Sequence, residues 1–588
     1  MTLATQLEKI ESSGLIRLAQ VDPELEYMFR HALVQDATYE SLLKADRRSL
    51  HHAVGQTLES LYAGRLDEIA ATLALHFEKA EEYEKAVHYL TRAGESAARV
   101  YAVDEAIELF GHALELVPTS FSEDDLIHLY SQYGRVLELA GRFDVAIEIY
   151  NRMRTEAVRQ KNPRMELVAL MARSIIHSTP TPLHDTNLAK DLSERALAIA
   201  SELGDPEAQS RIYWILMLAF LFDGRIQESI SYGEQSLEIA RAIDNPERLA
   251  FTLNDLSRCY GAAGLLEKAS AANLEARLLW EKLGNIPMLV DNLNTYAVQL
   301  LMGGKLEEGL ALVTQAYNTA HSIHNAWGQA FSLMITAMIS SKLGDVIRTV
   351  QAGEELFLLD PGQTFPPSQI AMRAILSDLY LELGQIEKAY KVVHEISEST
   401  KGLKSGYKPP ILASWARLEL VSGNLMEAKK LLDQALENYD PENFITFSPL
   451  FVTFAQYEIY TAQGDHLEAL ACLDKYIGVL YGKRVIFSLP EHLLAKAQAL
   501  VALKRKDEAI VVLKEVASTY TPLNFRRSLW KVYALLSELE LESGDPAGAD
   551  KSRRKAREYL DFLLDHTPAD LHESFLQLPA VAALLKTS

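Results

Sequence analysis

The sequence has 588 residues, 48% of them hydrophobic, and its 58 basic and 80 acidic residues give a net charge of −22. A single globule of this length would split into domains, whereas a stack of repeated units can bury apolar residues at any length. The acidic excess repels nucleic acids and anionic lipids, so neither is expected as a direct partner, while basic or cationic partners are compatible with it.

Residues 1–62 are predicted to form a small domain of helices and one strand pair. LEKIESSGLIRLAQ indicates a helix, a Gly turn and a short strand, and LEYMFRH alternates apolar residues as a second strand does. Two amphipathic helices are expected after it. Residues 63–118 are then predicted to be a helical joint that leads into a longer array.

The array, residues 119–566, is organised around a small residue that returns every forty positions. From Gly224 onward a turn residue precedes it by five positions, and this residue is Gly in every unit except the one with Lys504. The small residues are Ser229, Ala269, Gly309, Thr349, Ala389, Ala428, Ala469, Ala509 and Ala549. Nine copies at one spacing indicate an internal repeat.

Each unit is interpreted as helix, Gly turn, helix. Apolar residues recur at helical spacing before each Gly and resume after it. The Gly supplies the left-handed conformation that ends the first helix, and the small residue marks the close crossing of the second helix. Because each hairpin exposes an apolar flank that only its neighbours can cover, the units are expected to stack into a solenoid.

The turns carry a resemblance to a known repeat. LGQIEKA, SGNLMEA and AGLLEKA are similar to the tetratricopeptide turn, although the period here is about forty rather than about thirty-four residues. The predicted fold class is therefore all-α: a tetratricopeptide-like superhelical solenoid of long hairpins. Residues 567–588 are predicted to be a tail that caps its C-terminal end.

A second resemblance covers both ends of the chain. LIRL followed by YMFRHALVQDATYESLLKADRRSLHHAVGQTLE resembles the end of the winged-helix domain in bacterial STAND-class signalling ATPases, including those fused to adenylate cyclase domains. The next stretch, from ATLALHFEKA onward, and the closing LHESFLQLPAVAALL are also similar to that family. The resemblance implies that residues 1–62 are a winged-helix remnant and that the array receives a signal.

The nucleotide-binding domain of that family is absent from the sequence. Its phosphate loop ends in Gly-Lys-Ser/Thr, whereas GGKLEEG and YGKRV continue with Leu and Arg and are interpreted as ordinary turns. An ATPase domain is therefore expected in cis or in trans. A split gene product, a truncated one and an engineered fragment are all compatible with the sequence.

No motif for catalysis, a metal or a cofactor is found, so we expect neither an enzyme nor a cofactor. The 16 His residues are scattered, and neither HExxH nor CxxC occurs. Cys259 and Cys472, the two cysteines, are interpreted as small buried residues in a reducing compartment. The longest apolar run, Tyr213 to Phe222, is too short to span a bilayer, and a cytoplasmic protein is expected.

The surface predicted to bind is the concave wall formed by the first helices. In the tetratricopeptide family the inward positions lie about 18, 15 and 11 residues before the small residue. Carried onto this chain they are Arg211, Trp214 and Leu218; Phe251, Asn254 and Arg258; Asp291, Asn294 and Val298; Phe331, Met334 and Met338; Ala371, Ala374 and Asp378; Phe451, Phe454 and Glu458.

Seven of these residues are the candidate site. The polar ones would grip an anionic group, because Asn amides donate and accept while Arg offers a planar fork to carboxylate or phosphate. Trp214 and Phe251 would add flat apolar area. The alternative is that these residues line a wet groove without a ligand, or pair locally with Asp291. The candidates are Arg211, Trp214, Phe251, Asn254, Arg258, Asp291 and Asn294.

Two functional classes follow. The first is a regulatory module that senses an effector, either a small polar or anionic molecule or a protein or peptide, and relays its binding to the ATPase. The second is a constitutive protein-interaction scaffold without switching.

Overall fold

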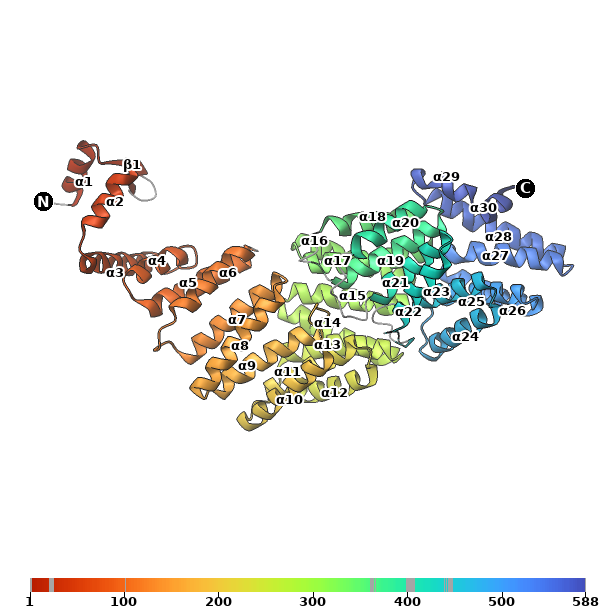
Figure 1. Cartoon of the computed structure of the whole chain (residues 1–588), viewed down its shortest axis with the longest axis horizontal. Helices are drawn as coiled ribbons and strands as arrows, with labels where there is room; N and C mark the ends of the chain where they lie inside the picture. Colours follow the sequence, from red (N-terminus) through yellow and green to blue (C-terminus); the bar gives the residue numbers. More distant parts are fainter. Residues whose placement is uncertain are drawn as a thin grey trace. The chain divides into compact units, whose positions relative to one another are not determined.

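The computed structural model describes residues 3–20, 26–100, 102–359, 364, 366–397, 408–437, 439, 441–442 and 448–586. The chain forms two compact units, Met1–Thr155 and Glu156–Ser588. Figure 1 shows that nearly every element is a helix and that consecutive helices pair side by side. In the described part of the chain, strands occur only between residues 16 and 29, which confirms the all-α class.

The first unit starts with helices and one strand pair, which are the elements predicted for residues 1–62. The strands pair antiparallel, with Ile16 opposite Phe29 and Leu18 opposite Tyr27. The elements of this unit are α1 (Leu3–Ser12), β1 (Ile16–Gln20), β2 (Glu26–Phe29), α2 (Ala32–Ser41), α3 (Lys44–Leu61), α4 (Ala70–Lys79), α5 (Tyr83–Arg99), α6 (Val103–Leu116), α7 (Glu123–Leu139) and most of α8 (Phe143–Gln160). The predicted boundary at residue 118 lies between α6 and α7, whereas the two units divide within α8.

The second unit is a continuous series of helical hairpins. Its helices are α9 (Pro163–Ser178), α10 (Thr186–Leu203), α11 (Pro206–Phe222), α12 (Ile226–Ala242), α13 (Pro246–Ala262), α14 (Leu266–Leu283), α15 (Ile286–Met302), α16 (Leu306–Ser322), α17 (Ala326–Leu343), α18 (Val346–Leu358), α19 (Pro366–Glu382), α20 (Ile386–Ser397), α21 (Lys408–Val421), α22 (Leu425–Leu436), α23 (Ser448–Gln463), α24 (His466–Gly482), α25 (Leu489–Ala502), α26 (Lys506–Tyr520), α27 (Arg526–Glu542), α28 (Pro546–Asp565), α29 (Ala569–Gln577) and α30 (Pro579–Lys586), with a 3₁₀ turn η3 (Thr521–Leu523) before α27.

Each hairpin has a defined turn between its two helices and, in four successive repeats, a side-chain cap at the start of its first helix. The predicted turn glycines have positive φ, from 72° at Gly384 to 86° at Gly544, and Lys504 takes the same conformation at 62°. The small residue five positions later is buried in every unit. Side chains at N-cap positions begin four successive first helices, each accepting from the backbone N–H three residues on. These caps are Asp205, Asn245, Asn285 and Asn325.

Repeats that are far apart in the sequence also pack together, which the sequence pattern did not predict. Ile486 donates its backbone N–H to the Met302 carbonyl at 2.8 Å, and Ile347 donates to the His566 carbonyl at 2.8 Å. Helices α17 and α27 are in contact. One apolar core cluster extends from Ala297 to Leu584. The array thus coils back on itself, because its curvature brings repeats that are four to five units apart into contact.

The C-terminal helices join this contact. Gln385, in the turn between α19 and α20, donates to the Ser574 hydroxyl at 2.7 Å, and that hydroxyl donates to the Leu383 carbonyl at 2.7 Å. Lys388 pairs with Asp570 at 2.6 Å. The segment predicted to be a capping tail therefore packs on an earlier turn of the coil as well as on α28, as far as residue 586.

Candidate functional site

The first helices of the hairpins form the inner layer of the coil. Besides its own partner, each of α11, α13, α15, α17, α19 and α21 contacts the next first helix along the chain. The seven candidate residues lie on three of these helices: Arg211 and Trp214 on α11, Phe251, Asn254 and Arg258 on α13, and Asp291 and Asn294 on α15.

The polar candidates at the α13–α15 contact bond to one another. Asp291 Oδ2 accepts from Asn254 Nδ2 at 2.8 Å and from an Arg258 Nη at 2.5 Å. Arg258 Nε also donates to the Thr295 hydroxyl at 3.0 Å. Asn254 Oδ1 accepts from Asn292 at 3.0 Å. These groups therefore already have partners. The arrangement matches the alternative of local pairing with Asp291.

Asn294 faces a different neighbour from Asn254, although both occupy the same slot in successive repeats. It is fully buried. Its amide oxygen accepts from the Ser332 hydroxyl at 2.9 Å, and its nitrogen donates to the Gly328 carbonyl at 3.4 Å. Both partners belong to α17, so Asn294 joins two repeats rather than the Asn254 cluster.

Asp255 is a member of this cluster that the spacing rule missed. Its carboxylate accepts from the Trp214 indole N–H at 2.9 Å and pairs with Arg258 at 3.4 Å. Burial raises the pKa of Asp255, against the lowering effect of Arg258. Burial also disfavours the Arg258 cation, but Asp291 and Asp255 outweigh it and raise the pKa of Arg258 above its usual value. The cluster thus holds one cation between two carboxylates.

The aromatic candidates make a second feature, which we call the arginine–aromatic patch and define as Arg211, Trp214, Arg248 and Phe251. The Trp214 and Phe251 rings lie edge to face with centroids 6.0 Å apart. The Arg248 guanidinium lies 5.5 Å from the first ring centroid and 5.6 Å from the second. Arg211 is exposed at the margin, and the other three are half-buried. Sequence reasoning missed Arg248, although it lies one helical turn before Phe251 on the same face.

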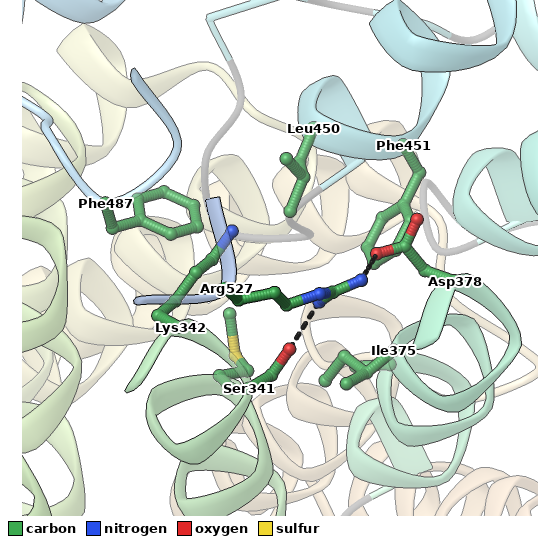
Figure 2. A pocket seen from close by; sticks show the side chains of 10 residues that line it. Ser341, Lys342, Ile375, Asp378, Leu450, Phe451, Phe487 and Arg527 are labelled. Atoms are coloured by element: carbon green, nitrogen blue, oxygen red, sulfur yellow. Dashed lines mark hydrogen bonds and ion pairs between the residues drawn. The ribbon is translucent and has the colours of Figure 1, made fainter. Parts of the chain in front are cut away.

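A third feature, further along the inner layer, is a small hollow between α17, α19, α23 and α27. Four predicted inward residues line it, namely Met338, Ala371, Asp378 and Phe451. Figure 2 shows Arg527 reaching across the hollow between Ser341 and Asp378, with Lys342 and Phe487 on one side. The remaining lining residues are Ile375 and Leu450.

Arg527 belongs to an ionic network, which we define as Asp378, Glu382, Arg417, Glu458, Arg527 and Lys531. Arg527 donates to Asp378 at 2.6 Å, to Glu382 at 3.0 Å and to the Ser341 hydroxyl. Arg417 pairs with Asp378 and, at 2.7 Å, with Glu458. Lys531 pairs with Glu382 at 2.8 Å. Three cations thus meet three carboxylates drawn from four repeats.

The electrostatics of the network favour the charged forms. Burial by itself would raise the pKa of Asp378, but Arg527 and Arg417 hold it well below its usual range. Glu382 behaves in the same way, because Arg527 and Lys531 outweigh burial and lower its pKa. Next to the network, Lys342 and Glu491 form another buried pair at 2.7 Å. Every charge named here has a partner of opposite sign, so the network primarily stabilises the coil.

Comparisons with known protein families agree with this geometry. A family described as "MalT-like TPR region" matches residues 284–556, and one described as "Tetratricopeptide repeat" matches residues 212–282. The array is built of tetratricopeptide-type repeats. This fold is typically a non-catalytic protein-interaction scaffold, and no catalytic family is indicated.

The chain is similar to one protein over a short stretch and to two solved structures over longer ones. An uncharacterized protein of Rhizobium meliloti (strain 1021) is 28% identical over 114 residues, which is 19% of this chain and 11% of that protein. The crystal structure of the APC/C hetero-tetramer Cut9–Hcn1 aligns over 92% of this chain and 97% of its own at 14% identity, with a TM-score of 0.53. That likeness shows the solenoid fold alone. The apo form of RapI aligns over 60% and 97% at 13% identity with a TM-score of 0.30, which carries no argument.

The remaining chemistry is sparse. Among the described residues, no group of three or more His, Cys, Asp or Glu side chains is arranged to hold a metal ion. Both cysteines are free, and burial raises the pKa of each thiol to about 12. In the same part of the chain, none of the helices combines the length and the apolar character that crossing a membrane requires.

Proposed function

We propose that this chain is a non-catalytic sensor module that binds an effector on the inner wall of its tetratricopeptide-type array. The arginine–aromatic patch carries the proposal. Its side chains are only partly covered, and they offer positive charge next to flat apolar rings, which suits a peptide or a small polar or anionic molecule. In the Asn254 cluster and the ionic network, by contrast, the charged groups bond to one another.

We further propose that the module works within a STAND-type signalling protein in the cytoplasm, and that an ATPase domain contacts its winged-helix remnant. The support lies in the N-terminal helices, whose apolar side chains are not covered by the described residues. Leu33 is 82% exposed, Leu43 72% and Leu61 66%, and α2 has no buried residue. Exposed apolar patches of this kind mark surfaces that another domain covers.

The experiment is a thermal-shift and calorimetric screen of the purified chain against amino acids, organic acids, phosphorylated metabolites and sugars. A ligand that binds only the folded state raises the melting temperature by mass action. Arg211→Glu should abolish the shift, because it reverses a charge at the exposed margin of the patch without disturbing the core. Lys305→Glu, an exposed change in a repeat turn, is the matched control.

The outcomes separate the functional classes. A metabolite shift that Arg211→Glu removes supports the sensor. Binding of a defined protein partner without any metabolite response favours a constitutive scaffold instead. Nucleotide hydrolysis by the purified chain would contradict both the sensor and the scaffold, provided that a substitution in the chain abolishes the activity and so excludes a contaminating enzyme.

A further inference from the structure

A row of hydrogen bonds joins an earlier part of the coil to a later one, at the C-terminal ends of α13, α15, α17 and α19. A carbonyl at each of these four ends accepts from a residue that lies between 183 and 221 positions further along the chain. We call this row the seam. Its pairs are the Ala262 carbonyl with Lys483 Nζ at 3.3 Å, Met302 with the Ile486 N–H at 2.8 Å, Leu343 with an Arg526 Nη at 3.5 Å, and Leu383 with the Ser574 hydroxyl at 2.7 Å.

The seam uses groups that a helix leaves without partners. The last four carbonyls of an α-helix have no donor within the helix, and water can bind them instead. Lys483 and Arg526 also bring positive charge to the negative end of the helix dipole. Further along the coil the corresponding turns are open, since a Cβ at Gly423, Gly464 or Gly544 would meet no described atom within 4 Å. Helix ends of this type are therefore stable in this array without a seam.

Polar contacts flank the seam on both sides. Lys342 and Glu491 are nearly buried, whereas Lys388 and Asp570 are exposed, so the flanking pairs extend from the interior to the surface. These contacts are Lys342 with Glu491 at 2.7 Å, Lys388 with Asp570 at 2.6 Å, Asn524 Nδ2 with Glu307 at 2.7 Å, and the Ile347 N–H with the His566 carbonyl at 2.8 Å.

The hairpins do not need the seam in order to stay folded. Each one packs against the hairpins before and after it, so the seam is an addition to the stack. If the seam parts, its carbonyls and charges pass into water and regain partners there, which offsets most of the lost attraction. Opening the seam should therefore require less free energy than unfolding any hairpin.

We propose that the seam is a clasp, which opens and closes as one cooperative unit while the hairpins remain folded. The donors lie on neighbouring hairpins of one stack, so parting at one position lifts the others. The inference goes beyond the proposed function and does not require an effector. The hollow is bounded from both sides of the seam, by Met338 on α17 and Arg527 on α27, so opening separates its walls. A molecule that prefers one of the two states would shift the balance between them.

The test is hydrogen exchange of the full chain, followed by mass spectrometry with residue-level fragmentation. The Ile486 and Ile347 amides both donate across the seam, to Met302 and His566, and we call them the seam amides. They should exchange faster than amides in the middle of α15 and α25, because only the seam has to open. Their protection should agree within about threefold, because one event exposes both.

A charge reversal tests whether the seam opens as one unit. Lys388→Glu places two carboxylates side by side on α20 and α29, where the wild-type pair is 42% and 66% exposed. Exchange should accelerate by about fivefold at both seam amides, although they lie on other helices. Adding Asp570→Lys should restore the wild-type rates. The matched control is Lys506→Glu, which breaks an exposed 2.7 Å pair with Glu542 between neighbouring hairpins and should leave both seam amides unchanged.

Three results would overturn the clasp. Seam amides that exchange as slowly as the middle of α25 would show that the seam opens only with global unfolding. Acceleration at the Ile347 amide alone would show independent contacts in place of one unit. Acceleration that Asp570→Lys does not reverse would show that the pair across the seam is not its cause. Equal circular dichroism of all variants is expected, because the hairpins stay folded in the open state, and a loss of helix in Lys388→Glu would contradict the proposal.

Discussion

The ionic network and the arginine–aromatic patch are built from similar side chains on the same inner layer, yet they differ in how their charges are satisfied. In the network, Arg527 meets two carboxylates and a hydroxyl from helices about 150 to 190 residues away. In the patch, Arg248 has aromatic rings beneath it and no hydrogen bond at Nε or Nη1 to the described residues. The comparison teaches that charge on the inner wall indicates binding only where the fold leaves it incompletely paired.

Asp378→Ala should produce the largest loss, because it removes the carboxylate that Arg417 and Arg527 share. Both arginines are nearly buried, at 10% and 8% side-chain exposure. The variant leaves three cations with only Glu382 and Glu458 as carboxylates, which should cost about 3 kcal/mol of unfolding free energy, measured by urea denaturation. Arg505→Ala, which removes an exposed pair with Glu508, is the control and should have no measurable effect. A loss equal to that of the control would show that the network does not hold the coil together.

Gly264→Ala and Gly423→Ala sharpen the comparison by separating turn conformation from long-range packing. Both glycines have positive φ, 76° and 86°. A Cβ at Gly264 would lie 2.6 Å from the Lys483 carbonyl oxygen, whereas at Gly423 nothing described lies within 4 Å. Gly423→Ala should cost about 1 kcal/mol and Gly264→Ala about 2 kcal/mol more. Equal losses in urea denaturation would mean that the turn at Gly264 does not pack against the Lys483 backbone.

Acid titration should distinguish Asp378 from Asp255. The folded pKa of Asp378 is lowered, so its stabilisation is present above about pH 4, the unfolded value, and is lost as the pH falls below it. The folded pKa of Asp255 is raised, so its contribution is present in acid and is lost as the pH rises through that folded value.

Asp378→Asn should therefore flatten the acid loss of stability, and Asp255→Asn should steepen it above about pH 4. The measurement is urea denaturation at a series of pH values. Slopes that change in the same direction for both variants would contradict the opposite environments assigned to the two carboxylates.

The repeat could be predicted from the sequence, but the contacts between distant repeats could not. Gly344 and Thr349 could be recognised as turn and crossing residues because their roles are local and recur every forty positions. The pairing of Arg527 with Asp378 spans 149 residues and depends on the pitch of the coil, which no local pattern encodes. Family spacing placed Trp214 and Phe251 on the inner wall, but it counted neither Asp255 nor Arg248.

The missed residues have physical reasons. Asp255 falls outside the inward spacing, but it pairs with Arg258 on the same helix and accepts from the Trp214 indole of another repeat. Arg248 does not occupy one of the inward positions that the family spacing defines. The absence of a hydrogen bond to its Nε and Nη1 atoms from the described residues depends on the packing of neighbouring helices, which the sequence does not show. The candidates Asn254, Arg258 and Asp291 were chosen for their chemistry as ligands, and the same chemistry lets them bond to one another.

The most direct test of the central claim is the melting temperature, without ligand, of two matched variants, Arg527→Met and Arg248→Met. Removing Arg527 leaves three carboxylates with only Arg417 and Lys531 as cations, so the first variant should melt several degrees lower. Removing Arg248 relieves an unpaired guanidinium and leaves an apolar side chain over Trp214 and Phe251, so the second should melt at the wild-type temperature or above it. Equal destabilisation by both variants would contradict the account, because Arg248 would then be as structural as Arg527.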